Sequence, residues 1–392
     1  MPIPSGPVCR AMMQCAECKG KGRCGLPRCP IVSRFHTQAQ IKPVSSYQGI
    51  APSVFIGSYG YPDVTGGPLM INDSDNPQDW IKNGLGIEEI VAVRARTIRG
   101  NSNLHAATGD LQEIAISSLP LDVDVAFEKP VAFSLSFDGT VAPVGFSGPV
   151  RSMDVIGSAR VERAVDRITS DTDLPATDAA VSLMESDIDV YQIAKLMTAG
   201  LLGKRRTFVP TRWAITAVDD TLSKSLKNEI ARFPPISGIS VFSAEIYGNR
   251  IVCLLVPGDY RYEMIEIWGK KTLWAGDEEV IVQDREGKKK SGYSPISGAY
   301  YSARLAVCEY LVKIRRSARI VVIRSISNEY WAPLGTWVIR EATRKAMENL
   351  PLSCATLDEG VRQACAATGS DTWLAHSTLI PEMRAQRTLF QF

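Results

Sequence analysis

Four cysteines near the N-terminus restrict what this chain can fold into more than any other feature of its sequence. Cys15, Cys18, Cys24 and Cys29 form a C-x2-C-x5-C-x4-C pattern in the stretch CAECKGKGRCGLPRC. Four thiolates can converge on one tetrahedral zinc ion, and the two-residue gap in the first pair lets both sulfurs face that ion. The closed ligand set predicts a structural Zn²⁺ rather than a catalytic one. A 4Fe–4S cluster or reduced free thiols are the alternatives, and Cys9 is a further candidate ligand.

The composition is that of an ordinary globular chain without a strong overall charge. Of the 392 residues, 45% are apolar and 22% are charged, and the formal net charge is +2. We expect no membrane segment and no signal peptide, because no apolar run is long enough, and we therefore expect a cytoplasmic protein. The charge is uneven, since the first 45 residues contain seven Lys or Arg and a single acid, Glu17. This asymmetry indicates a basic N-terminal module on a near-neutral body.

The order of strand-like and helix-like patterns predicts an α+β fold, in which helices flank a mixed sheet. Predicted strands cover 213–218, 239–246, 249–257, 262–268, 278–283 and 319–326, and predicted helices cover 300–317 and 336–350. Residues 37–50 are expected to form a linker. The expected domains are a small zinc-binding module with its linker at 1–45, an α+β core at 46–380 and a flexible tail at 381–392.

A segment rich in glycine and proline, PSVFIGSYGYPDVTGGPL, contains a short predicted strand at Val54–Ile56 and a loop after it. Gly57, Gly60, Gly66 and Gly67 permit positive φ angles and a close approach of the backbone to a ligand. Such a loop can cradle phosphate, but neither the Walker nor the Rossmann spacing is present. The sequence therefore does not decide between a nucleotide-binding loop and a plain structural turn.

The segment GKRRTFVPTRWAITAVDDT carries the densest group of residues that suit contact with nucleic acid. An arginine next to an aromatic ring suits this role, because the cation pairs with phosphate while a base stacks on the ring. The predicted contact residues are Lys204, Arg205, Arg206, Arg212 and Trp213. A solvated loop is the alternative for the Lys-Arg run.

Two adjacent carboxylates, Asp219 and Asp220, follow the predicted strand at 213–218. Carboxylates at a strand end can hold Mg²⁺ or Mn²⁺ for the cleavage of a phosphodiester bond. Alternatively, these residues cap a helix that begins near Leu222. The three histidines of the chain show no metal-ligand spacing, so a catalytic site would have to use carboxylates and arginines. The sequence does not decide whether the chain is an enzyme.

The chain ends on QRTLFQF, which is unusually apolar for a terminus. Gln386, Leu389 and Phe392 recur every three residues, and residues i and i+3 eclipse each other on a 3₁₀ turn. Leu389 and Phe392 would then form one apolar plug, with the Gln386 amide at its edge. The tail either docks on the body of its own chain or fills a pocket of another protein.

Six long stretches occur in a distinctive order along the chain: CAECKGKGRCGLPRCPI, PSVFIGSYGYPDVTGGPL, LLGKRRTFVPTRWAITAVDDT, YYSARLAVCEYL, YWAPLGTWVIREA and QRTLFQF. With these stretches the chain resembles the archaeal Nre DNA repair proteins over essentially its whole length. The resemblance implies a role in the repair of DNA damage. It also implies a zinc motif, carried here by the four N-terminal cysteines.

The resemblance further implies that the C-terminal tail binds the sliding clamp PCNA. Clamp-binding peptides place a glutamine first, an aliphatic residue fourth and aromatic residues at the seventh and eighth positions. Gln386, Leu389 and Phe392 occupy the first three of these positions, the chain stops before the last, and Phe390 supplies a second aromatic ring.

The leading hypothesis is a DNA repair factor that PCNA recruits and that binds DNA or a nucleotide through its basic and aromatic residues. One alternative is a metal-dependent nuclease or phosphodiesterase acting in repair. The other alternative is a non-catalytic scaffold that bridges PCNA to other repair proteins.

Overall fold

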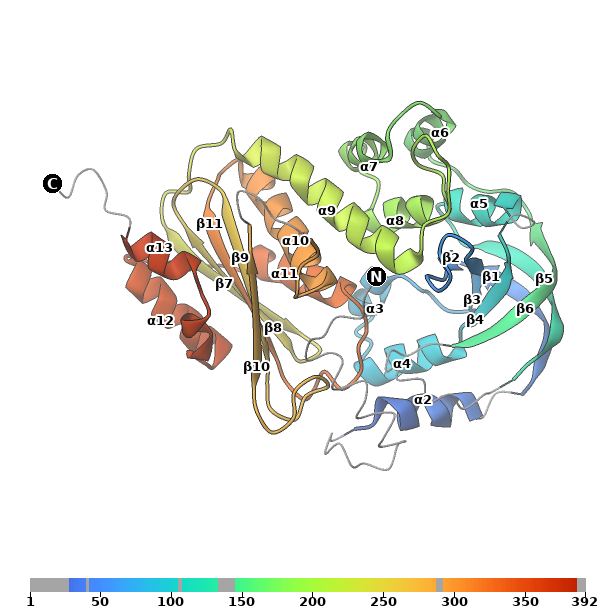
Figure 1. Ribbon diagram of the computed structural model, residues 1–392, viewed down its shortest axis with the longest axis horizontal. Helices are drawn as coiled ribbons and strands as arrows, with labels where there is room; N and C mark the ends of the chain where they lie inside the picture. The colour runs from blue at the N-terminus through green and yellow to red at the C-terminus, as the bar shows by residue number, and fades with distance from the viewer. Residues whose placement is uncertain (1–27, 40–41, 105–107, 133–144, 287–291, 386–392) are drawn as a thin grey trace. The chain divides into compact units, whose positions relative to one another are not determined.

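The computed structural model describes residues 28–39, 42–104, 108–132, 145–286 and 292–385 (Figure 1). They form two compact units, which we describe separately. The N-terminal unit comprises the described residues from Pro30 to Leu222, and the C-terminal unit comprises Arg28, Cys29 and those from Ser223 onward. Each unit combines a six-stranded mixed sheet with helices, which confirms the predicted α+β class. The division into 1–45, 46–380 and 381–392 stays a prediction.

The sheet of the N-terminal unit has the strand order β1-β5-β6-β4-β3-β2. Neighbouring strands are antiparallel except for β4 and β6, which are parallel. The first half of β5 alternates buried and exposed residues, as expected of a strand with one face on the core and the other toward solvent. The bounds are β1 Val44–Ala51, β2 Ser53–Ile56, β3 Thr65–Met70, β4 Ile98–Asn103, β5 Leu121–Val131 and β6 Phe146–Ile156.

Several helices of this unit have a capped first turn and bury one apolar side. Asp189, the N-cap of α8, accepts a hydrogen bond from the backbone N–H of Tyr191 at 2.7 Å. The carboxylate of Glu89 likewise closes the first turn of α4 by accepting from the N–H of Gly86 at 2.6 Å. The bounds are α2 Pro30–Ala39, α3 Pro77–Lys82, α4 Ile87–Arg96, α5 Thr108–Ile116, α6 Arg163–Ser170, α7 Ala176–Glu185 and α8 Val190–Thr198. A further helix, α9 Thr211–Ile230, begins in this unit, and its residues from Ser223 on belong to the C-terminal unit.

The sheet of the C-terminal unit has the strand order β10-β9-β11-β8-β7-β12, with β9 and β11 parallel and the other neighbours antiparallel. The inner strands β8 and β9 are buried along nearly their whole length, because helices cover both faces of the sheet there. Predicted strands 239–246, 249–257, 262–268, 278–283 and 319–326 are confirmed. The bounds are β7 Ile239–Ile246, β8 Asn249–Val256, β9 Arg261–Trp268, β10 Val280–Arg285, β11 Arg319–Ile326 and β12 Leu352–Cys354.

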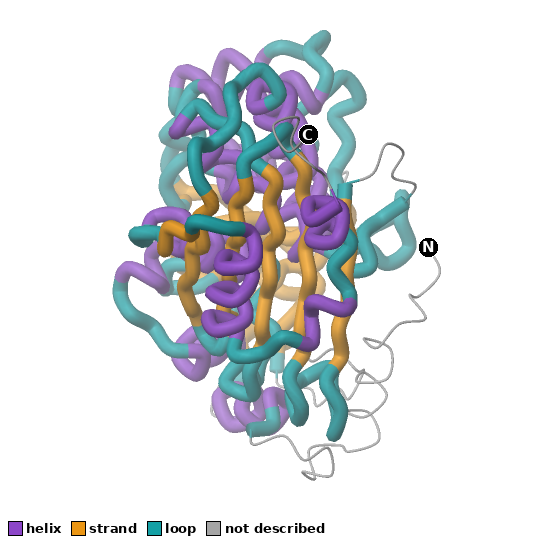
Figure 2. The backbone as a smooth tube through the Cα atoms, turned by 90° about the vertical axis from the view of Figure 1, so that its left-hand side faces the viewer, coloured by secondary structure: helices purple, strands orange, loops and turns teal. Residues whose placement is uncertain are grey.

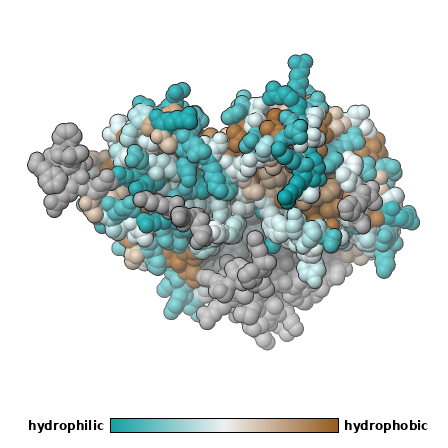
Figure 3. Space-filling model, turned by 45° about the horizontal axis from the view of Figure 1, so that its top comes forward, coloured by the Kyte–Doolittle hydropathy of each residue, from teal (hydrophilic) through white to brown (hydrophobic). Residues whose placement is uncertain are grey.

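Helices on one face of this sheet confirm the predictions for 300–317 and 336–350: α10 Gly298–Ile314 and α11 Trp337–Glu348. The other face, which Figure 2 turns toward the reader, carries α12 Leu357–Thr368, the 3₁₀ turn η1 Thr372–Ala375 and α13 Leu379–Ala385. Trp373, Leu379 and Met383 belong to one buried apolar cluster there, together with the strand residues Leu254 and Ile265. On the face shown in Figure 3, hydrophilic side chains surround smaller apolar patches.

The predicted strand at 213–218 is wrong, because these residues lie inside the 20-residue helix α9. The short apolar run WAITAV suits a strand, but a longer window shows apolar residues at every fourth position. Five apolar residues of α9 follow one another at intervals of four and are buried: Ala214, Val218, Leu222, Leu226 and Ile230. Asp219 and Asp220 therefore lie in mid-helix, neither at the end of a strand nor at the cap of a helix near Leu222.

The predicted linker at 37–50 is also wrong for most of its length. Its first residues belong to α2, and Val44 onward forms β1, an edge strand paired with β5. β1 is largely polar because most of its side chains are at least partly exposed. A polar edge strand carries little of the apolar alternation by which a strand is found from sequence.

Candidate nucleic-acid interface

The loop between β2 and β3, residues 57–64, is closed by its own backbone hydrogen bonds. At its base the N–H of Gly57 donates to the carbonyl of Thr65 at 2.9 Å. Within it the N–H of Asp63 donates to the carbonyl of Gly60 at 3.0 Å, and Gly60 takes a φ of +80°, which favours glycine. This tight loop displays two tyrosines: Tyr59 is 97% exposed and Tyr61 is 49% exposed.

The first turn of α9 lies against this loop, as Figure 1 shows beside β2. The N–H of Ile56, at the end of β2, donates to the Thr211 hydroxyl at 2.9 Å. The rings of Tyr61 and Trp213 meet edge to face, with centroids 5.0 Å apart and an interplanar angle of 61°. Two segments singled out from the sequence, about 150 residues apart, therefore form one surface.

Arg212 is exposed on the same helical turn as Trp213. The first turn of a helix also carries unpaired N–H groups and a partial positive charge, which favour anions. We call Tyr59, Tyr61, Arg212 and Trp213 the aromatic–basic surface. Its arrangement offers rings for stacking and a cation for phosphate, the two contacts that single-stranded nucleic acid uses.

The Lys-Arg run that precedes α9 divides into two kinds of residue. Lys204 and Arg205 are exposed. Arg206 is partly buried and holds the chain together, donating to the backbone carbonyls of Leu201 and Asp171. Arg206 therefore has a structural role, whereas its two predecessors are accessible to a ligand.

The sequence prediction named Arg212 and Trp213 but not Tyr59 and Tyr61 as contact residues. It described the loop that carries the tyrosines only through its glycines. Two of those glycines, Gly66 and Gly67, lie in β3, where a Cβ on Gly67 would come within 2.4 Å of the Gly100 carbonyl oxygen on β4. These two glycines serve strand packing, and the exposed tyrosines next to Gly60 were the stronger signal for a surface contact.

Asp219 is fully buried and Asp220 is partly buried on α9. Successive side chains on a helix point about 100° apart, so adjacent residues do not face each other. An ion held here would therefore be ligated by one of the two together with groups from other elements. Among the described residues, no group of three or more His, Cys, Asp or Glu side chains is placed to hold a metal ion.

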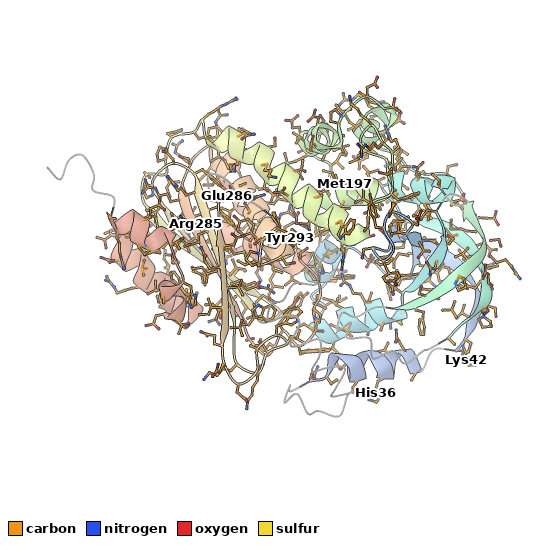
Figure 4. The ribbon with its side chains drawn as sticks, in the orientation of Figure 1. His36, Lys42, Met197, Arg285, Glu286 and Tyr293 are labelled. Carbon is orange, nitrogen blue, oxygen red and sulfur yellow. The ribbon has the colours of Figure 1, made fainter. Side chains whose placement is uncertain are left out.

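A second group of charged residues lies beside α10 in the C-terminal unit. Arg304 is buried, donates from Nε to the Ser223 hydroxyl at 3.0 Å and pairs with Glu286, which Figure 4 labels. Lys227 also pairs with Glu286, at 2.6 Å. Burial alone would raise the pKa of Glu286, but Arg304 and Lys227 outweigh it and lower the pKa. The carboxylate is thus held ionised between two cations, which is a structural arrangement that joins α9, β10 and α10.

Lys195 on α8 is a titratable group of the N-terminal unit whose pKa is changed by burial. Its Nζ donates to the backbone carbonyls of Ser117 at 2.9 Å and Pro52 at 3.4 Å. Burial lowers the pKa of Lys195 from 10.5 to about 8. The side chain ties α8 to the end of α5 and to the turn before β2.

The zinc and tail predictions fall mostly outside the described residues. Of the four predicted zinc ligands, only Cys29 is described, and it is partly buried. Its neighbour Arg28 lies over the ring of Trp331, 5.7 Å from the centroid. Gln386, Leu389, Phe390 and Phe392 also lie outside, directly after α13. No described helix is both long and apolar enough to cross a membrane.

Known proteins resemble this chain over nearly all of its length. The family model described as archaeal Nre, N-terminal, matches residues 23–275, and the one described as archaeal Nre, C-terminal, matches residues 285–392. DNA repair protein NreB of Archaeoglobus fulgidus is 35% identical over 97% of this chain and 100% of its own length. DNA repair protein NreA of the same organism is 34% identical, over 93% of this chain and 96% of its own length.

A relative from another archaeon also matches most of this chain. DNA repair protein NreA of Haloferax volcanii is 32% identical over 81% of this chain and 82% of its own length. No solved structure matches the chain. With both family models matched in order and these relatives covering most of the sequence, the chain belongs to the archaeal Nre family of DNA repair proteins.

Proposed function

We propose that this protein is a cytoplasmic DNA repair factor that PCNA recruits through its C-terminal tail and that binds DNA through the aromatic–basic surface. The observation that carries the DNA-binding part is the contact between Tyr61 and Trp213, with Arg212 on the same turn. An aromatic pair at the surface of a DNA repair protein supports stacking of unpaired bases, because every base has a face that can stack. Arg212, Lys204 and Arg205 supply cations for the phosphates.

The DNA-binding proposal is tested by fluorescence anisotropy with labelled single-stranded and duplex oligonucleotides at two salt concentrations. We expect tighter binding to the single strand and weaker binding at higher salt. Replacing Tyr59 or Tyr61 with Ala should weaken single-strand binding on the order of tenfold, since one stacked base contributes about 1–3 kcal/mol.

A matched charge control is available on the same unit. Arg212→Ala should weaken binding and reduce its salt dependence, because one phosphate contact is lost. Arg151→Ala removes an exposed arginine of β6, which β4 and β3 separate from β2 in the sheet, and should leave binding unchanged. Equal effects of the two arginine variants would exclude the aromatic–basic surface as the contact.

The recruitment part rests on the spacing of Gln386, Leu389 and Phe392, on membership of a DNA repair family and on the place where the tail begins. α13 ends at Ala385, and Leu379, Ile380 and Met383 bury this helix in the C-terminal unit. A tail attached to a buried helix can reach a partner without disturbing the core. Phe390 is the second aromatic ring available to the clamp.

The proposed N-terminal zinc site uses Cys15, Cys18, Cys24 and Cys29 as four thiolate ligands. Metal analysis of the purified protein should give about one equivalent of zinc per chain, as one closed four-ligand site requires. Iron with visible absorbance would show an iron–sulfur cluster instead. Protein without metal would show that the cysteines are reduced free thiols.

Nuclease activity and a purely scaffolding role are the competing proposals. Incubation with damaged and structured DNA plus Mg²⁺ or Mn²⁺ separates them, because only a nuclease cleaves. Cleavage that is lost in the double variant Asp219→Asn with Asp220→Asn would assign the metal to these carboxylates. Absence of both cleavage and DNA affinity would favour the scaffold.

A further inference from the structure

A groove of about 400 Å³ opens at the edge of the C-terminal sheet, and its lining includes none of the residues used in the proposed function. Three segments and one residue of β8 line it: the segments are the start of β7 with the residues before it, the end of α10 with Arg316 after it, and the chain around β12. The apolar lining residues are Ile236, Ile239, Phe242, Leu255, Ile314 and Pro351. Phe242 and Tyr310 form its aromatic wall, with ring centroids 5.3 Å apart.

Hydrogen bonds hold the three segments in place. The N–H of Ile236 donates to the carbonyl of Ser317 at 2.9 Å, and the N–H of Ser317 donates to the carbonyl of Pro234 at 2.9 Å. The amide of Asn349 donates to the carbonyl of Ser243 at 2.8 Å, which fixes the chain that leads into β12. The groove is therefore preformed, so a ligand would not have to order its walls.

The apolar surface continues beyond the groove onto the sheet edge. Leu350 is 96% exposed and Leu352 is 54% exposed, on either side of the groove residue Pro351. β12 is the last strand of the sheet and pairs with β7; among the described strands none pairs with its other edge. An open strand edge beside apolar pockets is the arrangement that binds an extended peptide as an added strand.

Among the described residues that line the groove, the charged one is basic. Arg316 lines it, and Arg315 follows α10 with its guanidinium 5.5 Å from the ring centroid of Phe233. Both arginines and Lys313 are exposed. Among the described residues that line the groove, none is acidic. Charge complementarity therefore favours an acidic ligand.

We propose that this groove is a docking site for an extended peptide segment of a partner protein, in which apolar side chains alternate with Asp or Glu. The peptide lies along β12 as an added strand, because among the described strands none pairs with the outer edge of β12. Its apolar side chains enter the space between Phe242 and Ile314, and its carboxylates face Arg316. A peptide fits better than a compact small molecule, since the apolar surface runs along the strand edge past Leu352.

Gly238 offers a way to fill the groove without disturbing the fold. It lines the groove, a Cβ built on it meets nothing within 4 Å, and its φ lies outside the left-handed region. Gly238→Leu therefore places a side chain in the space that the peptide needs. Gly276→Leu is the matched control, because Gly276 is equally open and lies outside the groove lining.

The test measures retention of two hexapeptide libraries on the immobilised full-length protein. In the first library Leu, Val or Phe alternates with Asp or Glu, and in the second Lys or Arg replaces the acidic residues. We expect the wild type and Gly276→Leu to retain the acidic library at least tenfold better than the basic one. Gly238→Leu should lose this retention, and Arg316→Glu should reverse the preference. The melting temperature of each variant confirms that it is folded.

Equal retention of the two libraries, or retention that survives Gly238→Leu, would overturn the proposal. Analytical ultracentrifugation tests the other occupant, a second copy of this chain. A dimer that Gly238→Leu dissociates and Gly276→Leu does not would assign the groove to self-association and so reject the peptide.

Discussion

The carboxylate of Glu263 on β9 accepts hydrogen bonds from both the backbone N–H and the hydroxyl of Thr378, at 2.8 and 2.7 Å. Its other oxygen accepts from the Ser377 hydroxyl at 2.5 Å, and the N–H of Leu379 lies 3.3 Å from each oxygen. Glu263 is fully buried, so these donors replace the water that a carboxylate needs. An inner strand of the sheet thereby holds the first turn of α13, the helix after which the proposed clamp-binding tail follows in the sequence.

We predict that Glu263→Ala destabilises the protein by about 3 kcal/mol, because it leaves the buried Ser377 hydroxyl and the buried N–H of Leu379 without their acceptor. Urea unfolding followed by circular dichroism measures the change. Glu382→Ala is the control, since Glu382 on α13 is exposed and pairs with Arg285 at 3.1 Å at the surface. Glu382→Ala should lower the free energy of unfolding by less than about 1 kcal/mol. Equal losses in the two variants would contradict the role given to Glu263.

We predict that Lys195 makes the protein more stable as the pH rises from about 8 toward 10.5, the values of its pKa in the folded chain and in free lysine. Between these values the unfolded chain binds the proton more strongly, so raising the pH favours the folded state. Buried cysteines such as Cys253, whose pKa is raised to about 12, act in the opposite direction.

The contribution of Lys195 is therefore measured as a difference between wild type and Lys195→Met. The urea unfolding midpoints of both proteins are measured at pH 7.5 and 9.5. Because both proteins contain the same cysteines, the cysteine contribution cancels in the difference between their midpoints. The wild type should gain stability relative to the variant between these values. A constant difference would mean that Lys195 keeps its ordinary pKa.

We predict that Gly67→Ala destabilises the N-terminal unit by about 1–3 kcal/mol, the usual cost of forcing an extra carbon into a packed site. The new Cβ would lie 2.4 Å from a backbone carbonyl oxygen of Gly100, and the paired strands β3 and β4 cannot separate without losing hydrogen bonds. Gly109→Ala in α5 is the control, because its Cβ meets nothing within 4 Å. Thermal melting should show a loss for the first variant and a small gain for the second.

We predict that deleting residues 386–392 abolishes binding to PCNA and leaves the melting temperature nearly unchanged. The tail would order only on the clamp, so its loss removes no packing from the core. Leu389→Ala and Phe392→Ala should each weaken binding, whereas Gln391→Ala, outside the three-residue spacing, should not. A large drop in melting temperature on deletion would instead show that the tail docks on its own chain.

Local sequence patterns were sufficient to predict the class of the fold and much of the C-terminal sheet. β8 is a long apolar run and β11 contains the apolar run Ile320–Ile323, because helices bury both faces of the sheet there. Such runs can be recognised without knowing their neighbours. α9 was missed because a six-residue window showed β-branched and apolar residues. The decisive pattern, a buried residue at every fourth position from Ala214 to Ile230, spans the whole helix.

By itself the sequence determined the spacing of the cysteines and of the tail residues, from which a zinc site and a clamp-binding segment are predicted, and it determined the family to which the chain belongs. The tertiary structure alone decided that Tyr61 meets Trp213 and that Asp219 is buried within a helix. It also decided that the carboxylate of Glu263 accepts hydrogen bonds from residues more than 100 positions away in the sequence. The physical reason is that spacing along the chain governs local geometry, whereas contacts between distant residues depend on how sheets and helices pack.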